Sequence, residues 1–98
     1  MIRIIYEWQV KPEDVAAFCE AWKLATTRIH EAIAGARGSV LLQDRSCAGR
    51  ILTIARWDSI AAWESFWKTA NPSQMLKMRA LGQRVSVVAY DEFADFTV

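Results

Sequence analysis

The residues with the greatest potential for chemistry in this sequence are its tryptophans. Five indoles in 98 residues is a heavy aromatic content for a small domain, and they stand at Trp8, Trp22, Trp57, Trp63 and Trp67. Any one of them at helical spacing is more typical of core packing. Together, five large rings leave irregular spaces between them, so the set favours an apolar pocket lined by aromatic side chains. The pattern leaves open whether the rings line that pocket or fill it.

Two other side chains could supply polar chemistry beside such a pocket. His30 is the only histidine, and an imidazole can act as a base or as a ligand to a metal or haem. A histidine near the end of a helix is also favoured there by the helix dipole, which is the more common role. Tyr6 could orient a hydroxylated ring by hydrogen bonding, or it could be a core tyrosine whose hydroxyl is satisfied internally. Tyr6 and His30 are therefore the candidate catalytic residues.

Several motifs that would indicate other chemistries are absent from the sequence. It contains no glycine-rich phosphate loop, no GxSxG, no CxxC and no HExxH. Its two cysteines, Cys19 and Cys47, form neither a disulfide framework nor a metal cluster. We therefore expect no metal site, no bound nucleotide and no cofactor. An enzyme without a cofactor would rely on its pocket, and its substrate would supply the electrons for the reaction.

Hydrophobic periodicity predicts strands and helices along nearly the whole chain. Residues 2–10 alternate between apolar and mixed positions, the pattern of a strand with one buried face. Apolar residues at steps of three or four after Pro12 predict one long amphipathic helix over residues 12–33. The remaining predicted elements are a hairpin of strands 39–46 and 50–57, a helix at 60–70, a second helix from a cap at Asn71 to a stop at Gly82, and a last strand at 85–96.

The order of these elements, β-α-β-β-α-β, predicts a ferredoxin-like α+β fold in one domain spanning residues 1–98. In that fold, helices cover one face of a four-stranded antiparallel sheet. The opposite face is expected to mix apolar and charged positions, namely Arg3, Ile5, Glu7, Leu41, Gln43 and Val88 or their neighbours. Such a face on a small chain favours a homodimer formed through the sheet faces over a monomer with a solvated sheet.

Composition and charge exclude several classes of protein. The hydrophobic content of 53% is too high for a disordered chain. Twelve basic and eleven acidic residues are interspersed, so we expect no nucleic-acid surface. The apolar stretches are too short to cross a membrane, and the N-terminus does not read as a signal peptide. With few cysteines, the chain is expected to be cytoplasmic.

Several segments share a pattern with one known family. They are the opening residues 6–12, Phe18 and Trp22 in the long helix, Gly38-Ser39 before the second strand, and the segments 54–59 and 62–67. With these, the chain resembles the antibiotic biosynthesis monooxygenase family of the dimeric α/β-barrel superfamily over essentially its full length. The resemblance implies a homodimer whose two sheets form a barrel, with a pocket in each subunit between helices and sheet.

The resemblance also implies an activity. Members of the family include cofactor-independent oxygenases of polyphenolic anthrones or quinols, in which the deprotonated substrate passes an electron to dioxygen. Here a small aromatic substrate would be oxidised by an oxidoreductase of the monooxygenase type. Tyr6 and His30 would supply the polar groups. The substrate ring would be bound by the aromatic residues Trp22, Trp63, Phe66 and Trp67.

Two alternatives remain open from the sequence. The first is a non-catalytic small-molecule-binding or stress-related protein of the same fold, whose tryptophans fill the pocket. The second is haem binding or degradation. It is disfavoured because residues 74–79 contain no histidine where haem-degrading relatives carry their axial ligand, and residues 6–8 lack their asparagine. A cavity of roughly 300 Å³ or more would favour the oxygenase, and a closed core would favour the binding protein.

Overall fold

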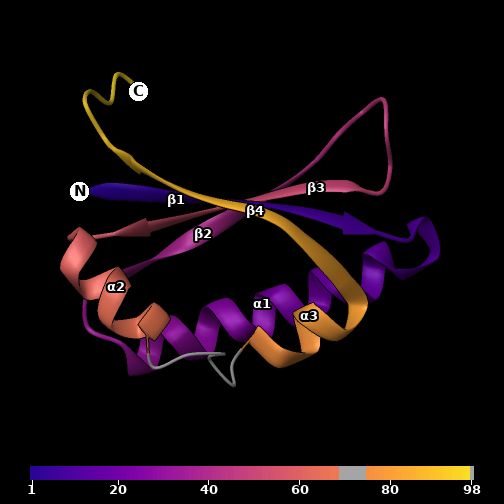
Figure 1. Cartoon of the computed structure of the whole chain (residues 1–98), viewed down its shortest axis with the longest axis horizontal. Helices are drawn as coiled ribbons and strands as arrows, with labels where there is room; N and C mark the ends of the chain where they lie inside the picture. Colours follow the sequence, from indigo (N-terminus) through magenta and orange to yellow (C-terminus); the bar gives the residue numbers. More distant parts are fainter. Residues whose placement is uncertain (69–74, 98) are drawn as a thin grey trace.

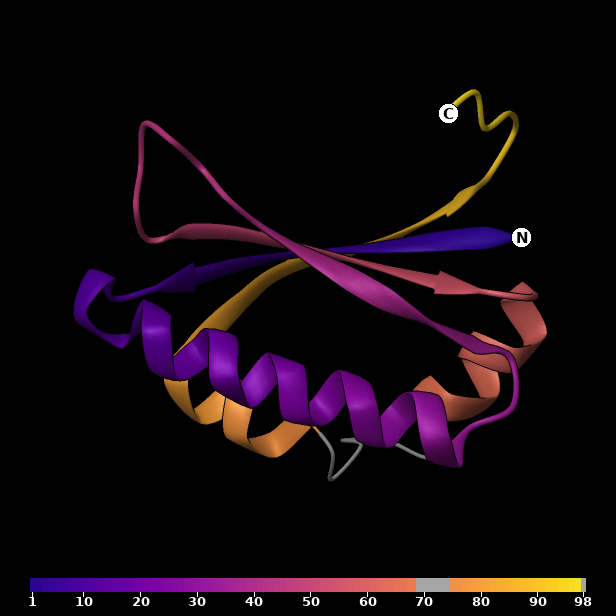
Figure 2. The same ribbon diagram turned by 180° about the vertical axis from the view of Figure 1, so that it is seen from behind.

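A computed structural model describes residues 1–68 and 75–97 and has the predicted ferredoxin-like α+β arrangement (Figure 1). The elements are β1 (Ile2–Val10), the 3-10 helix η1 (Pro12–Asp14), α1 (Val15–Ala32), β2 (Ala36–Gln43), β3 (Arg50–Trp57), α2 (Ile60–Lys68), α3 (Leu76–Leu81) and β4 (Gly82–Asp91). The sheet is antiparallel with the strand order β2-β3-β1-β4. The helices all lie on one face of it, as the reverse view also shows (Figure 2).

The predicted strands 2–10 and 50–57 are confirmed, whereas two other strands are displaced. β2 spans Ala36–Gln43 rather than 39–46, and β4 spans Gly82–Asp91 rather than 85–96. The second strand ends early because the Asp44 carboxylate accepts a hydrogen bond from the Ser46 backbone N–H at 2.7 Å, which closes a turn. The predicted cap at Asn71 lies outside the described residues.

The long predicted helix and the two shorter ones are present with shifted bounds, since α2 spans Ile60–Lys68 and α3 begins only at Leu76. The long helix predicted from residue 12 begins as the 3-10 turn η1, and α1 follows it from Val15 to Ala32. Gly82 ends α3 as predicted, and the chain passes directly from there into β4. None of the helices in the described part of the chain is long and apolar enough to cross a membrane.

The core lies between β1 and the helices. The even-numbered side chains of β1 are all buried, and two of them, Ile4 and Trp8, are completely inaccessible. The ring of Trp8 meets Phe18 of α1 edge-on, with 5.2 Å between ring centroids. α1 also presents the small buried residues Ala21 and Ala25 to the sheet. Because alanine has a short side chain, it lets the helix lie close to large rings on the strands.

The assignment of two residues to the outer face of the sheet is wrong. Leu41 pairs with the buried Thr53 and packs against the core, and Gln43 pairs with the buried Ile51, so both are on the helix side. The outer face instead carries their neighbours, Val40 and Leu42, each about half exposed. The sequence correctly predicts that the side chains of β2 alternate between the two faces, but a period of two does not say which set of residues faces the helices.

We expect Ile4→Ala to destabilise the protein by about 2–5 kcal/mol, because it opens a cavity in a fully packed site. The matched control is Ile60→Ala, at an exposed position on α2, which should change the free energy of unfolding by no more than about 0.5 kcal/mol. Urea unfolding followed by tryptophan fluorescence measures both. Similar losses from the two substitutions would contradict this description of the core.

Candidate functional site

A small cavity lies between the helices and the half of the sheet formed by β1, β2 and β3. Its volume is about 50 Å³. Four aromatic residues line it together with smaller apolar ones, namely Tyr6, Trp22, Trp57 and Phe66. Its polar lining residues include His30, Ser39, Thr53 and Arg56. A typical small-molecule site has roughly 300–1,000 Å³, so this space by itself holds only a very small ligand.

Indole N–H groups bind two of the hydroxyls on the cavity wall. Trp8 donates to the Thr53 hydroxyl at 3.0 Å, within the buried core. Trp22, from α1, donates to the Ser39 hydroxyl of β2 at 3.3 Å. A buried N–H without an acceptor costs about 1–3 kcal/mol, so these bonds fix the rings relative to the strands.

The third such hydroxyl belongs to Tyr6, which connects the cavity to an aromatic cluster on α2. Trp63 donates its indole N–H to the Tyr6 oxygen at 3.2 Å. Four residues further along the same helix, Trp67 stacks on Trp63 with 5.4 Å between centroids and lies 5.8 Å from the Tyr6 ring. The guanidinium of Arg84 sits 4.7 Å above the Trp67 ring, a cation–π contact.

The environment of Tyr6 keeps its phenol protonated. Burial raises the pKa of this group above its ordinary value of 10.0, because a phenolate would be poorly solvated there. The Trp63 hydrogen bond and the charge of Arg84 oppose this shift only in part. Tyr6 therefore remains a neutral phenol at neutral pH, with its own O–H available as a donor.

His30 is held in one orientation at the end of α1. Its Nδ1 lies 2.9 Å from the Ala36 carbonyl oxygen. A carbonyl only accepts, so Nδ1 must donate, and in the neutral ring Nε2 then carries a lone pair. The residue also lies in the last turn of α1, where the helix dipole favours it, so the structural role and a chemical role are compatible.

The structure brings most of the predicted site residues together. Tyr6, His30, Trp22 and Phe66 line the cavity itself. Trp63 and Trp67 lie next to it, joined through Tyr6.

Sequence reasoning missed several lining residues. Thr53 carried a usable signal, because it is a polar residue at an inward position of a strand and pairs with Tyr6. Arg56 carried none, since alternation places it on the outer face of β3. Among residues 1–68 and 75–97, no three histidine, cysteine or acidic side chains are grouped so that they could hold a metal ion.

Comparison with known proteins identifies one family. The sequence model of the family antibiotic biosynthesis monooxygenase matches residues 1–77. No curated protein sequence matches the chain. A structure from Bordetella bronchiseptica that carries the family's name superposes with a TM-score of 0.81 at 14% identity, covering 95% of this chain and 97% of that one.

A second solved structure also has the same fold. It is SnoaB, described as a cofactor-independent oxygenase from Streptomyces nogalater and solved as a point mutant. It superposes with a TM-score of 0.78 at 15% identity, covering 97% of this chain and 95% of that one. At these identities the likeness concerns the fold.

We expect the phenol of Tyr6 to titrate above pH 10.0 and Trp63→Phe to raise its pKa further, because that substitution removes the N–H that stabilises the phenolate. The measurement is the tyrosinate absorbance in a Tyr90→Phe background, which leaves Tyr6 as the single tyrosine. Circular dichroism at each pH verifies that the fold persists. A lower titration midpoint in the Trp63 variant would contradict the assigned hydrogen bond.

Proposed function

Because the chain belongs to the antibiotic biosynthesis monooxygenase family, we propose that it is a cofactor-independent monooxygenase that oxidises an aromatic polyphenol or quinol with dioxygen. The observation that carries the proposal is the placement of a base, His30, and a phenol, Tyr6, on the wall of one aromatic cavity. Such a pair can remove a proton from a hydroxylated ring and stabilise the resulting oxyanion.

The proposed reaction requires only the substrate and dioxygen as redox partners. Nε2 of His30 accepts a proton from the substrate, and the Tyr6 O–H donates a hydrogen bond to the anion. The anion passes one electron to dioxygen, and the substrate radical and superoxide combine to form a carbon–oxygen bond. Protonation of this adduct gives a hydroperoxide. In an anthrone the reacting carbon is the ring methylene, and loss of water from the hydroperoxide converts it into a carbonyl. One oxygen atom enters the product and the other leaves as water.

The substrate ring is assigned to the aromatic cluster rather than to the cavity interior. The cavity of about 50 Å³ is smaller than the engineered cavity of about 150 Å³ that binds benzene, so its interior favours a ligand smaller than a ring. Trp63 and Trp67 are partly exposed and stack beside Tyr6, so a substrate ring against them lies next to the Tyr6 hydroxyl. A haem macrocycle is larger still, so the volume of the cavity does not favour haem binding.

The same small volume favours a second candidate, a non-catalytic binding protein of this fold. In that case Trp63 and Trp67 complete the aromatic packing around Tyr6 instead of receiving a substrate. The two candidates differ in turnover, because only the oxygenase consumes dioxygen.

We expect dioxygen uptake with a hydroxylated anthrone as substrate, above the rate of its spontaneous oxidation. His30→Ala should lower kcat by about a hundredfold and Tyr6→Phe by about tenfold, because each removes one polar group from the cavity wall. Lys23→Gln, on the exposed side of α1, is the matched control and should keep the full rate. An oxygen electrode and product mass spectrometry measure the reaction. Tight anthrone binding without uptake would support the binding protein instead.

We also propose that the protein acts as a homodimer joined through the outer faces of its sheets. The support is an apolar set on that face, in which Val40, Leu42, Val88 and Tyr90 are all between 42% and 51% exposed. These residues stand on the two edge strands, and the half-buried Ile54 of β3 and Ile5 of β1 lie on the same face between them. Isolated exposed apolar residues are ordinary on a surface, but an apolar set that spans a sheet face is typical of an interface.

We expect Leu42→Asp to shift the protein toward a monomer, because it places a charge within the apolar set of this face. Leu24→Asp is the control, since Leu24 is 45% exposed on α1 and lies away from the sheet. Light scattering after size exclusion gives the mass of each variant. A dimer that persists in Leu42→Asp and dissociates in Leu24→Asp would place the interface on the helices.

A further inference from the structure

The chain continues past β4 as an extended stretch, residues 92–97, which we call the C-terminal segment. Its first residue prolongs the pairing of the strands, because the Glu92 backbone N–H donates to the Met1 carbonyl oxygen at 3.1 Å. Beyond that bond, residues 92–97 form neither helix nor strand. The segment rises from the face of the sheet opposite the helices (Figure 1, Figure 2). It therefore stands on the outer face, which the helices leave uncovered.

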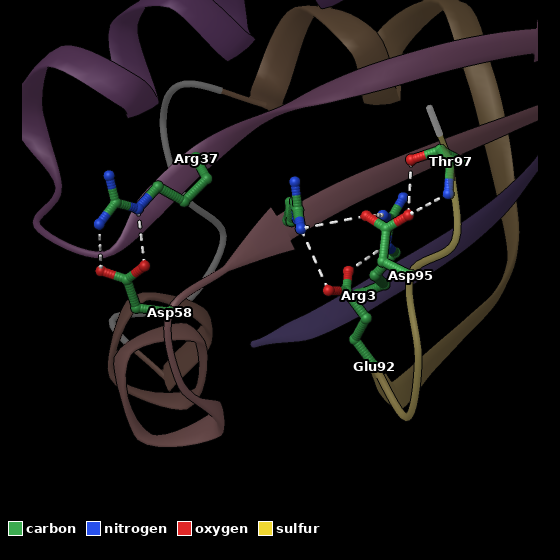
Figure 3. A network of polar contacts seen from close by, with 7 residues as sticks. Arg3, Arg37, Asp58, Glu92, Asp95 and Thr97 are labelled. Carbon is green, nitrogen blue, oxygen red and sulfur yellow. Dashed lines mark hydrogen bonds and ion pairs between the residues drawn. The ribbon is translucent and has the colours of Figure 1, made fainter.

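Two acidic side chains hold the C-terminal segment against its own sheet. Arg3 of β1 and Arg56 of β3 are cross-strand partners. The Glu92 carboxylate accepts hydrogen bonds from Arg3 Nε at 2.8 Å and from a terminal nitrogen of Arg56 at 3.1 Å (Figure 3). Asp95 lies 3.7 Å from Arg3 and 3.6 Å from Arg56. The Thr97 backbone N–H also donates to Asp95 at 3.0 Å, so contacts define the path of the segment as far as Thr97.

The two phenyl rings of the same segment have no contact with the chain that carries them. Phe93 is 101% exposed and Phe96 is 97% exposed, more than any other large apolar residue in the described part of the chain. Each follows an acid that is held by the arginines, so the rings cannot turn onto their own sheet while those ion pairs persist. Phenylalanine is among the side chains that gain most from burial, and here two of them remain in water.

An apolar row crosses the outer face beside the two arginines. Cross-strand pairs join Val40 of β2 to Ile54 of β3, Ile54 to Ile5 of β1, and Ile5 to Val88 of β4. The row thus extends over all four strands of the sheet. Val40 and Val88 at its ends are 50% and 42% exposed, and the two isoleucines between them are half-buried. Apolar side chains aligned in this way form a continuous surface for contact with a second layer.

We propose that the C-terminal segment clasps a second copy of the chain, with Phe93 and Phe96 of each copy packed on the apolar row of the other. The inference rests on the proposed homodimer. Each copy carries an apolar row without a cover and two rings without a surface, and its own ion pairs keep the two apart. A two-fold axis through the outer face makes the contact reciprocal, because both copies supply both parts.

A second copy fits this surface better than an unrelated partner does. The segment stands on the side of the sheet where the second sheet of the proposed dimer would lie, so the clasp is continuous with that interface (Figure 1). Glu92 and Asp95 stay with the arginines of their own chain, so the contact buries no unpaired charge. Only the rings, which face away from these ion pairs, change their surroundings when the dimer forms.

The first test measures the affinity of the dimer by dilution in the analytical ultracentrifuge. Phe93→Ser combined with Phe96→Ser should raise the dissociation constant at least about thirtyfold, because it removes both rings and leaves the ion pairs intact. The matched control, Leu24→Ser combined with Leu76→Ser, removes two exposed apolar side chains from α1 and α3. It should change the constant by less than about threefold. Circular dichroism verifies that both variants remain folded.

The second test locates the contact by nuclear magnetic resonance. In a dimer assembled from one isotope-labelled and one unlabelled copy, filtered spectra report only contacts between the two chains. The rings of Phe93 and Phe96 should show such contacts with the methyl groups of the apolar row. These signals should disappear in the double phenylalanine variant.

Two results would overturn the clasp and leave the sheet-face dimer in place. One is a double phenylalanine variant that dimerises as tightly as the unaltered chain while Leu42→Asp dissociates. The other is a dimer in which the rings show no contact with the partner's apolar row. If the unaltered chain is a monomer at every concentration, the clasp and the homodimer both fail. Neither test depends on dioxygen uptake, so the oxygenase function is judged separately.

Discussion

Three hydrogen bonds from indole N–H groups to hydroxyls hold the inner surface of this protein in place. Trp8 binds Thr53, Trp22 binds Ser39, and Trp63 binds Tyr6. Each bond meets the requirement that a buried polar group find a partner, and each joins an aromatic ring to a strand. All three hydroxyls lie on the cavity wall. The packing of the tryptophans and the polarity of the site are therefore set by the same contacts.

The second constraint is the central position of β1. This strand pairs with β3 on one side and β4 on the other, and its inward residues are buried along its whole length. Because Tyr6 stands at an inward position in the middle of such a strand, its phenol is desolvated. The raised pKa of this group follows from the fold itself and requires no neighbouring negative charge.

A β-bulge interrupts the sheet where Arg37 and Gly38 of β2 stand opposite Arg56 of β3. Helices cover one face, and the other carries arginines paired with Glu92 and Asp95 after β4. At the bulge, Gly38 and Ser39 line the inner cavity, while Arg3 and Arg56 contact Glu92 and Asp95 on the outer face (Figure 3). A glycine with positive φ at the bulge makes this backbone path accessible.

The sequence by itself determined the fold class, the four strands and the aromatic identity of the site, since alternation and helical spacing depend only on the order of residues. It also singled out Tyr6 and His30, because they are among the few polar side chains predicted to lie beside the aromatic residues. Only the tertiary structure decided that Leu41 faces inward, that Trp63 and Trp67 stack beside the cavity, and that Arg56 borders it. These features depend on strand register and on the bulge, which arise from contacts between residues far apart in the chain.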